Sequence, residues 1–251
     1  MLGYGKDINF ILLRKILRVI KNLLPNFLPI PYLYKFNLKL LILPKHHWTQ
    51  YLQGTYEPET FEKIKEIFKN KQIKSFWDVG ANVGMYSVFI AKRYSCYVYA
   101  FEPAKKYHSF LKLNTTFFKK VKAHNFGIGS INKKEKIILT DEPGSNYIAR
   151  NKFDKNTKKS EICEIRTIKK LSKIKTPNLV KIDVEGFEYE ILNYSIDFFK
   201  KNKTILILEI DEENLKRYSK NKKDILHLLK SRNYLIERIS KSNNYYCYLK
   251  I

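Results

Sequence analysis

Short apolar runs alternate with amphipathic segments along the chain from about residue 59 onward. This alternation is typical of a mainly parallel sheet with helices on both faces, because each parallel connection needs a long crossover. We predict strands near residues 75–79, 97–101, 122–127, 179–184 and 205–210, and helices near 60–70, 84–94, 105–118 and 187–200. The pattern therefore indicates an α/β fold with a mainly parallel, twisted sheet.

Two later segments break the alternation of strands and helices. Residues 129–175 contain a predicted hairpin around LTDEPGSNY and a lysine-rich run, NKFDKNTKKSE. An insertion beside the strand ends is typical of an acceptor-site loop or lid. Near the end of the chain, apolar runs at 234–239 and 245–251 flank KSNN, which predicts an antiparallel hairpin that closes the sheet.

The N-terminal part has a different pattern. Residues 10–24, FILLRKILRVIKNLL, place apolar residues at helical spacing with four basic residues between them, which predicts a basic amphipathic helix. The charges and the three prolines of the following NLLPNFLPIPYLY argue against a bilayer span, and no small-residue processing site indicates a cleaved signal. We expect a helical extension over residues 1–55 and a catalytic domain over 56–251.

Two roles for the amphipathic helix stay open. Its apolar face packs on the main domain or on a second subunit, or it lies in the interface of an anionic cytoplasmic leaflet. The second role implies a cytoplasmic protein that is peripheral at the inner face of the membrane. The sequence does not decide between the two, and it leaves the oligomeric state undetermined.

Composition narrows the class of protein further. The length of 251 residues suits one α/β domain with an extension, and the net charge is +24. Because lysines are spread over the whole chain, we interpret this charge as a general bias at least as readily as a patch for a polyanion. The three cysteines are far apart in the sequence, which favours core residues of a protein in a reducing compartment; they are Cys96, Cys163 and Cys247. No spacing of cysteines and histidines predicts a zinc site.

The stretch FWDVGANVGMYS, residues 76–87, predicts a tight turn from a strand into a helix. Gly80 and Gly84 permit positive φ and close ligand approach, and the helix N-terminus presents free N–H groups. The turn reads D-x-G-x-N-x-G, which differs from the G-x-G-x-x-G of dinucleotide sites. A carboxylate at Asp78 suits a ligand that carries a cationic amino group and a sulfonium.

The second predicted strand ends in YAFEP, which places Glu102 at its carboxyl end. An acidic residue about twenty positions beyond the glycines accepts hydrogen bonds from both hydroxyls of an adenosine ribose. Alternatively, Glu102 is a helix N-terminal carboxylate before Pro103. Together with the glycine turn, it favours a nucleoside cofactor.

Three further carboxylates are predicted at the same edge of the sheet. Asp183 and Glu185 follow an apolar strand in KIDVEGFE, and Glu209 ends the strand ILILEI. Neighbouring carboxylates raise the pKa of one member, which suits a base that takes a proton from an alcohol. We therefore predict all three as catalytic residues.

The glutamates near this edge also have structural alternatives to a catalytic role. Glu185 beside Gly186 is alternatively a helix cap. Glu188 and Glu190 fall on the following helix and are predicted to face solvent. A metal that bridges Asp183 and Glu209 would suit their oxygens, but the sequence offers no dedicated ligand set, so we predict no metal.

The stretches DVGANVGMYS, AFEP, KIDVEGFEYEIL and ILEI together resemble the FkbM-type methyltransferases, in the expected order from about residue 56 to 210. The resemblance implies the class I Rossmann-like methyltransferase fold and S-adenosylmethionine as cofactor. It implies cofactor contacts at Asp78, Gly80, Asn82, Gly84 and Glu102.

Details of this resemblance add three expectations. Asn82 is expected to adopt left-handed geometry and to offer its amide to the cofactor. Asn125 ends the third strand, where class I methyltransferases contact the adenine, while His124 is expected to be partly buried and hydrogen-bonded. One departure is the stretch 167–170, TIKK, where the family usually carries a threonine-leucine-aspartate-aspartate run.

The predicted activity is O-methylation of a hydroxyl on a sugar, glycan or related metabolite. The charge motivates RNA ribose methylation as an alternative. The sequence lacks both the asparagine-or-aspartate-proline-proline-aromatic motif for exocyclic amines and the proline-cysteine nucleophile for cytosine carbon. Nucleic acid is therefore disfavoured as the acceptor, although ribose methylation needs neither motif and stays open as the alternative. The altered 167–170 stretch leaves open a scaffold that binds the cofactor without turnover.

Overall fold

The structure is a computed structural model that describes residues 30–32, 41–43, 57–140, 145–150, 154 and 159–250. The chain divides into two units, residues 1–56 and 57–251. In the first unit, β1 (Ile30–Tyr32) pairs antiparallel with β2 (Leu41–Leu43). The amphipathic helix predicted over 10–24 lies outside the described residues and stays a prediction. No helix in the described ranges is both long and apolar enough to cross a bilayer.

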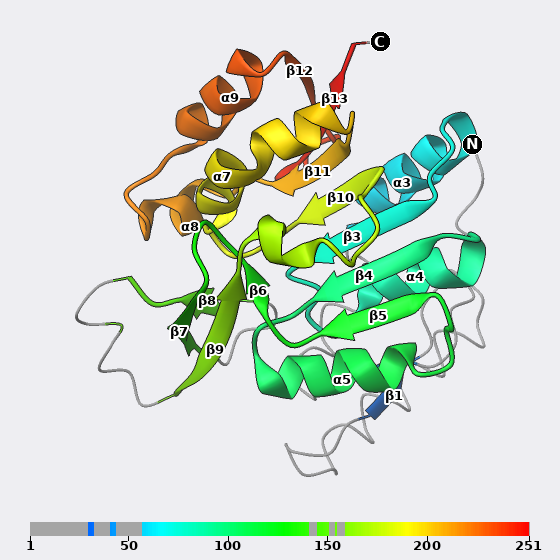
Figure 1. Ribbon diagram of the computed structural model, residues 1–251, viewed down its shortest axis with the longest axis vertical. Coiled ribbons are helices and arrows are strands. Elements are labelled where there is room, and N and C mark those ends of the chain that lie inside the picture. The colour runs from blue at the N-terminus through cyan, green and yellow to red at the C-terminus, as the bar shows by residue number, and fades with distance from the viewer. Residues whose placement is uncertain are drawn as a thin grey trace. The chain divides into compact units, whose positions relative to one another are not determined.

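A seven-stranded sheet with the order β12-β13-β11-β10-β3-β4-β5 forms the centre of the second unit (Figure 1). Its strands are β3 (Ser75–Val79), β4 (Tyr97–Phe101), β5 (Val121–His124), β10 (Leu179–Ile182), β11 (Ile205–Glu209), β12 (Tyr234–Arg238) and β13 (Asn244–Leu249). Five of these strands, β5, β4, β3, β10 and β11, are parallel to one another, and β13 is antiparallel to both of its neighbours. The predicted parallel sheet with a C-terminal antiparallel hairpin is therefore confirmed.

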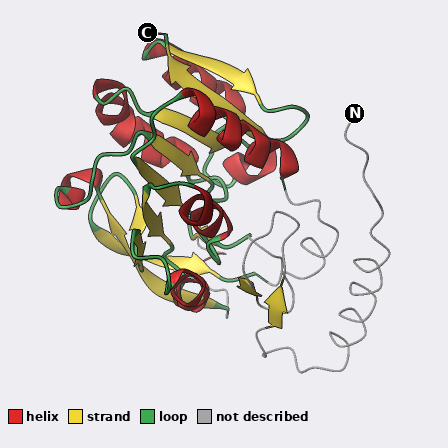
Figure 2. Cartoon of the chain, turned by 90° about the vertical axis from the view of Figure 1, so that its right-hand side faces the viewer, coloured by secondary structure: helices red, strands yellow, loops and turns green. Residues whose placement is uncertain are grey.

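Helices cover both faces of this sheet, as Figure 2 shows. They are α3 (Pro58–Asn70), α4 (Met85–Arg93), α5 (Lys105–Thr115), α7 (Glu188–Lys201), α8 (Glu212–Lys216) and α9 (Lys222–Ser231). The chain moves from β3 towards β5 through α4 and α5, and in the opposite direction from β10 to β11 through α7. Because both crossovers are right-handed, this reversal places α4 and α7 on opposite faces.

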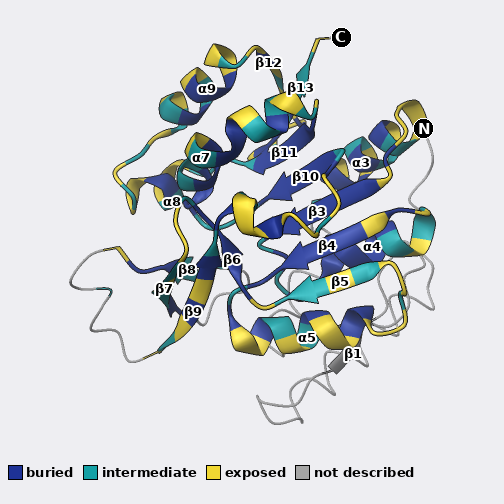
Figure 3. Ribbon diagram, in the orientation of Figure 1, coloured by how far each residue is buried: buried dark blue, intermediate teal, exposed yellow. Residues whose placement is uncertain are grey.

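The core lies along the central strands. All residues of β3 and β10 are buried, although both strands include a charged residue (Figure 3). Near-continuous apolar runs are typical of parallel strands that are covered on both faces. The three cysteines, Cys96, Cys163 and Cys247, are free and buried, as predicted for core residues.

The insertion between β5 and β10 forms a second sheet instead of only a loop. Its strands are β6 (Gly127–Ile128), β7 (Lys133–Ile138), β8 (Tyr147–Ile148) and β9 (Ser160–Arg166), in the order β6-β9-β7-β8. The predicted hairpin around LTDEPGSNY is present as the antiparallel pair β7 and β8. The lysine-rich run lies mostly outside the described residues, and the role of the insertion at an acceptor site stays a prediction.

Two boundaries differ from the prediction in ways that affect the site. The strand predicted over 122–127 is two strands, because β5 ends at His124 and β6 pairs with β9 in the second sheet. Between them, Nδ2 of Asn125 donates to the carbonyl oxygens of Glu102 and Pro103, at 2.9 and 3.1 Å, and turns the chain. In addition, β10 ends at Ile182, so the carboxylates of DVEG lie in a loop.

Candidate active site

The loops after β3 and β10 meet at the carboxyl edge of the sheet, where the strand order reverses. The backbone N–H of Asp183 donates to the carbonyl oxygen of Val79 at 3.0 Å. On the other side, the N–H groups of Gly80 and Ala81 both donate to the carbonyl oxygen of Phe101 at 3.0 Å. The glycine turn is thereby fixed between β4 and the DVEG loop, at the position where open α/β sheets bind ligands.

Gly80 is required by the packing of this turn as well as by any ligand. It has a φ of 82°, and a Cβ at this position would lie 1.8 Å from the carbonyl oxygen of Asp183. Only glycine lets the two loops approach this closely. Further along the turn, Gly84 has a φ of 90° and precedes the first residue of α4. Asn82 has a φ of 51°, the left-handed geometry that was expected for it.

The carboxylate of Asp78 is buried at the start of α4. Its Oδ2 accepts hydrogen bonds from the backbone N–H of Ser87 at 3.1 Å and from Oγ of Ser87 at 2.6 Å. The first turn of α4 has no acidic residue of its own, so Asp78 supplies the negative charge that the helix N-terminus favours. Burial raises the pKa of Asp78 to about 6. Its predicted contact with a cationic group of the cofactor remains a prediction.

Glu102 joins the end of β4 to the glycine turn. Its Oε2 accepts from the N–H of Asn82, and its Oε1 accepts from the N–H of Ala104, both at 2.8 Å. Burial raises the pKa of Glu102 to about 7. The carboxyl group therefore stabilises the start of α5, and each oxygen keeps a second lone pair for a ligand hydroxyl.

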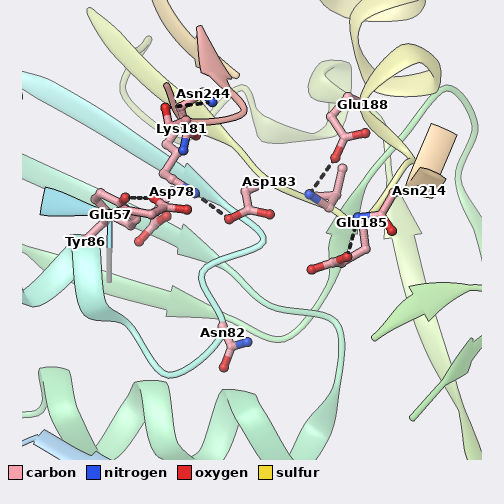
Figure 4. Close-up of polar contacts among 12 residues, drawn as sticks. Glu57, Asp78, Asn82, Tyr86, Lys181, Asp183, Glu185, Glu188, Asn214 and Asn244 are labelled. Carbon is pink, nitrogen blue, oxygen red and sulfur yellow. Dashed lines mark hydrogen bonds and ion pairs between the residues drawn. The ribbon is translucent and has the colours of Figure 1, made fainter. Parts of the chain in front are cut away.

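These groups fit a nucleoside cofactor. The Oδ1 atom of Asn82 is buried, and no donor among the described residues reaches it. Figure 4 shows Asn82 on the turn, on the same edge as Asp183. An orphaned acceptor, a carboxyl group with spare lone pairs and a glycine turn together suit a ligand that offers hydroxyl and amino donors. Among the described residues, Asn125 donates to the backbone carbonyls of Glu102 and Pro103, and its predicted adenine contact stays a prediction.

Asp183, Glu185 and Glu209 come together at this edge. One carboxylate oxygen from each residue lies within 4.8 Å of the others. Figure 4 shows that Asp183 and Glu185 extend from the loop after β10, and Glu209 is the last residue of β11. The strand ends in the sequence predict these three residues at one edge of the sheet, and the fold brings them into one cluster.

Lys181 completes the cluster and was not identified from the sequence. It is 2% exposed, and its Nζ lies 2.5 Å from Oδ2 of Asp183 and 4.5 Å from the ring centre of Tyr86. Burial alone would lower the pKa of Lys181, but the charges of Asp183 and other nearby carboxylates raise it overall. The signal in the sequence was a single lysine inside the otherwise apolar strand LVKI.

The three carboxyl groups have pKa values that are shifted in different directions, in part because Lys181 lies beside Asp183. Burial would raise the pKa of Asp183, but the charge of Lys181 and a hydrogen bond from Glu209 lower it overall. The charge of Asp183, together with burial, raises the pKa of Glu209. Burial and the charge of Asp183 also raise the pKa of Glu185 to about 8. At neutral pH, Asp183 is therefore ionised, and Glu185 is poised to gain or lose a proton.

Glu188 does not face solvent, which corrects the prediction for it. It is 2% exposed, and its Oε1 accepts from the N–H groups of Val184 at 2.9 Å and Gly186 at 3.2 Å. As the first residue of α7, Glu188 folds back over the DVEG loop and satisfies its backbone. The cap role that was considered for Glu185 is thus filled by Glu188, whereas Oε2 of Glu185 accepts from Nδ2 of Asn214 at 2.7 Å.

Glu190 and His124 also differ from their predictions. Glu190 is half-buried, with Oε2 3.5 Å from Nη2 of Arg150, and it accepts a hydrogen bond from Oγ of Ser130. His124 was expected to be hydrogen-bonded, but its buried Nε2 has no partner among the described residues. Its ring stacks on the ring of Phe101, with 5.3 Å between the ring centres. Burial lowers the pKa of His124 to about 4. His124 is therefore a neutral aromatic residue that is partly buried, as expected, at the end of β5.

Within the described part of the chain, the stretch TIKK, residues 167–170, contacts the second sheet and not the carboxylate cluster. Thr167 precedes a 3-10 helix, Ile168–Leu171, and its N–H donates to Oδ1 of Asn132 at 3.0 Å. Lys169 and Lys170 are exposed. The structure therefore gives this stretch a local role at the end of the second sheet.

Oxygens at the spacing of Asp183, Glu185 and Glu209 would suit a hard divalent cation. However, the ammonium of Lys181 already neutralises Asp183, and the other two carboxyl groups have raised pKa values. The cluster is balanced in charge by the protein itself. The expectation that no metal takes part stays a prediction.

The comparison with protein families decides the class. The model of the methyltransferase FkbM domain matches residues 78–236, which is more than half of the chain. The chain belongs to the FkbM methyltransferase family. This membership identifies it as an S-adenosylmethionine-dependent methyltransferase, and it confirms the predicted enzyme class and cofactor.

Solved structures support the fold of this FkbM-family chain. A protein of Staphylococcus aureus, named as a candidate caffeoyl-CoA O-methyltransferase, is 11% identical with a TM-score of 0.50, covering 78% of this chain and 85% of that one. At this identity the likeness shows the fold alone, and it confirms the class I methyltransferase fold.

A methyltransferase FkbM from Methylobacillus flagellatus KT is 18% identical with a TM-score of 0.45. The match covers 70% of this chain but only 43% of that protein, so this chain spans less than half of its length. A comparison with curated protein sequences finds no significant match.

Proposed function

We propose that the chain transfers a methyl group from S-adenosylmethionine to a hydroxyl of a sugar, glycan or related metabolite. The observation that carries this proposal is the cluster of Asp183, Glu185 and Glu209 beside the glycine turn, in which one carboxyl group has a pKa of about 8. A general base whose pKa lies near the working pH suits the removal of a proton from an alcohol.

The cofactor would be held by the residues of the turn and of the neighbouring strand end, namely Asp78, Gly80, Asn82, Gly84, Glu102 and Asn125. When bound, S-adenosylmethionine supplies a methyl group that its sulfonium already activates. In this proposal Asn82 and Glu102 accept hydrogen bonds from the nucleoside, since both have acceptor capacity left. The absence of a Cβ at Gly80 lets the turn pack directly against the carbonyl oxygen of Asp183, which keeps the cofactor residues of the turn next to the DVEG loop.

Glu185 is the proposed base. Its carboxylate takes the proton of the acceptor hydroxyl, and the amide of Asn214 holds the carboxylate in place. Asp183 stays ionised beside Lys181, and its charge keeps the pKa of Glu185 raised. Glu209 shares a hydrogen bond with Asp183 and fixes its orientation. The rest of the rate enhancement comes from positioning the acceptor oxygen.

Calorimetric titration of the full chain with S-adenosylmethionine and, separately, with a nicotinamide dinucleotide tests the cofactor site. We expect saturable binding of S-adenosylmethionine alone. A radiolabelled methyl donor then reports transfer to a panel of sugars and glycans. Glu185→Gln is expected to bind the cofactor normally and to lose transfer. Cofactor binding with no transfer to any hydroxylated acceptor would favour a scaffold without turnover.

The proposal also includes a cytoplasmic chain with a peripheral membrane contact through residues 10–24. The support is the basic amphipathic pattern of this stretch. Co-sedimentation with anionic and with neutral vesicles tests the contact, because an interfacial basic helix binds the anionic vesicles more strongly. Equal recovery with both vesicle types would remove this part of the proposal.

A further inference from the structure

A cavity of about 390 Å³ lies where the insertion meets α7 and the segment after α8. Residues that line it include Arg150, Gly186, Tyr189, Arg217, Tyr218 and Lys220. The hydroxyl of Tyr218 donates to the carbonyl oxygen of Ile148 in β8 at 2.8 Å, which ties the segment after α8 to the second sheet. The cavity therefore has walls from three separate elements of the fold.

Aromatic rings hold the cations of the cavity in place. The guanidinium of Arg150 lies 5.0 Å from the ring centre of Phe187, and that of Arg217 lies 4.6 Å from Tyr147. Nζ of Lys220 lies 4.2 Å from the ring centre of Tyr189. A stacked guanidinium keeps the N–H groups of its edge available for a carboxylate or phosphate.

Positive charge exceeds negative charge in the lining. Three cations contribute to it, whereas Glu190, 3.5 Å from Arg150, is the carboxylate among the lining residues. Nη1 of Arg217 donates to the backbone carbonyl oxygen of Glu185 at 3.4 Å, and the charge of Arg217 lowers the pKa of Glu185 by less than burial and the charge of Asp183 raise it. The lining has a surplus of positive charge that an anionic ligand would neutralise.

The cavity adjoins the proposed base. Gly186 lines the cavity and directly follows Glu185, and Arg217 contacts the backbone of Glu185. A ligand in the cavity would therefore lie next to the residue that we propose takes the hydroxyl proton. Aromatic side chains beside charged donors also suit the mixed apolar and polar surface of a sugar.

We infer that this cavity is the acceptor subsite, and that it binds a carboxylate or phosphate group of the acceptor through Arg150, Arg217 and Lys220. The inference rests on the proposed function and narrows its substrate class to acidic sugars. Uronic acids and sugar phosphates share the anionic group that the arginines recognise. The hydroxyl that receives the methyl group would lie on the side of the ligand that faces Glu185.

Calorimetric titration of the full chain with glucose, glucuronate, glucose 6-phosphate and inorganic phosphate at constant ionic strength tests the site. We expect the anionic probes to bind and glucose to bind at least about tenfold more weakly, since hydrogen bonds to charged groups contribute most of the affinity. Of glucuronate and glucose 6-phosphate, the one that binds more tightly identifies the preferred anion.

Arg150→Gln and Arg217→Gln are each expected to weaken the anionic probes by about tenfold. Lys216→Gln is the matched control, because Lys216 precedes Arg217, is exposed and pairs with Glu213. It should leave every affinity unchanged. None of the three changes should alter the affinity for S-adenosylmethionine. Binding of glucose as tight as that of both anionic sugars, no binding of any anionic probe, or arginine variants that bind like the control would overturn the inference.

Methyl transfer measured in parallel separates this inference from the proposed function. Transfer to neutral sugars that persists in both arginine variants would overturn the anionic subsite and leave the proposed O-methylation in place. Arginine-dependent binding of anionic sugars without methyl transfer to any of them would support the subsite and overturn the proposed activity.

Discussion

The ammonium of Lys181 lies 2.5 Å from Oδ2 of Asp183, two residues further along the chain. Lys181 is buried in the central strand β10, and Asp183 lies in the loop that carries the proposed catalytic carboxylates. This ion pair keeps one carboxyl group ionised. Burial and the charge of Asp183 raise the pKa of Glu185, and the charge of Asp183 together with burial raises that of Glu209.

Replacement of Lys181 by methionine keeps the length of the side chain but leaves the partly buried Asp183 without its counter-charge. We expect Lys181→Met to lower the free energy of unfolding by about 3–5 kcal/mol. Denaturant unfolding measures this loss, and the double variant with Asp183→Asn should recover part of it. The exposed control Lys216→Met should change stability by less than about 0.5 kcal/mol. Equal unfolding midpoints for Lys181→Met and the wild type would mean that the pair contributes nothing to stability.

Asn82 allows the backbone of the glycine turn to be separated from its ligand contact. Asn82→Gly keeps the left-handed φ of 51° but removes the amide, so we expect it to fold normally. Its affinity for S-adenosylmethionine should fall by about three- to tenfold, the worth of one neutral hydrogen bond. Asn82→Val should instead lose about 1–2 kcal/mol of stability, because a branched side chain is strained at positive φ. Wild-type affinity in Asn82→Gly would remove the amide from the cofactor site.

The pH dependence of methyl transfer tests the role of Glu185. Only the deprotonated carboxylate accepts a proton, so kcat should rise as the pH increases through about 8, the raised pKa of Glu185. In Glu185→Gln this rise should disappear, and the rate should fall by about 10²- to 10⁴-fold. Glu59→Gln is the control and should keep the wild-type profile, because Glu59 is an exposed residue in the first turn of α3. A flat wild-type profile between neutral and alkaline pH would argue against this base.

Removal of divalent cations tests the balance of charge in the cluster. Because Lys181 already neutralises Asp183, we expect methyl transfer to be unchanged after treatment with EDTA. Equilibrium dialysis with Mg²⁺ should likewise show no uptake that depends on Glu209. A loss of activity in EDTA that Mg²⁺ restores would show instead that the three carboxylates bind a metal.

Glu188 predicts how stability depends on pH. Burial raises its pKa from 4.5 to about 7, so the folded chain holds a proton that the unfolded chain releases. Its contribution to stability is complete below pH 4.5 and is lost as the pH rises through about 7. Between about pH 5 and pH 8, Glu188→Gln should therefore lose about 2 kcal/mol less stability than the wild type. Denaturant unfolding at both pH values measures this difference, and identical losses would contradict it.

Local patterns were sufficient for the order of the elements. The apolar runs and their turns predicted the parallel strands, the C-terminal hairpin and the edge at which Asp183, Glu185 and Glu209 meet, because parallel strands all end at one side of a sheet. The left-handed geometry of Asn82 was expected from the family resemblance together with the tolerance of asparagine for positive φ. These features depend on residues that are close in sequence.

Contacts between residues that are far apart in the sequence decided the remaining details of the site. Helical spacing did not show that Glu188 folds back over the DVEG loop, or that Asn125 ends β5 by binding backbone carbonyls. The pairing of Lys181 with Asp183 and the cavity beside Gly186 depend on how strands and loops pack in space. The sequence by itself determined which groups lie at the carboxyl edge. Only the tertiary structure decided which of them are buried, paired or able to titrate, because desolvation and charge depend on neighbours that folding brings together.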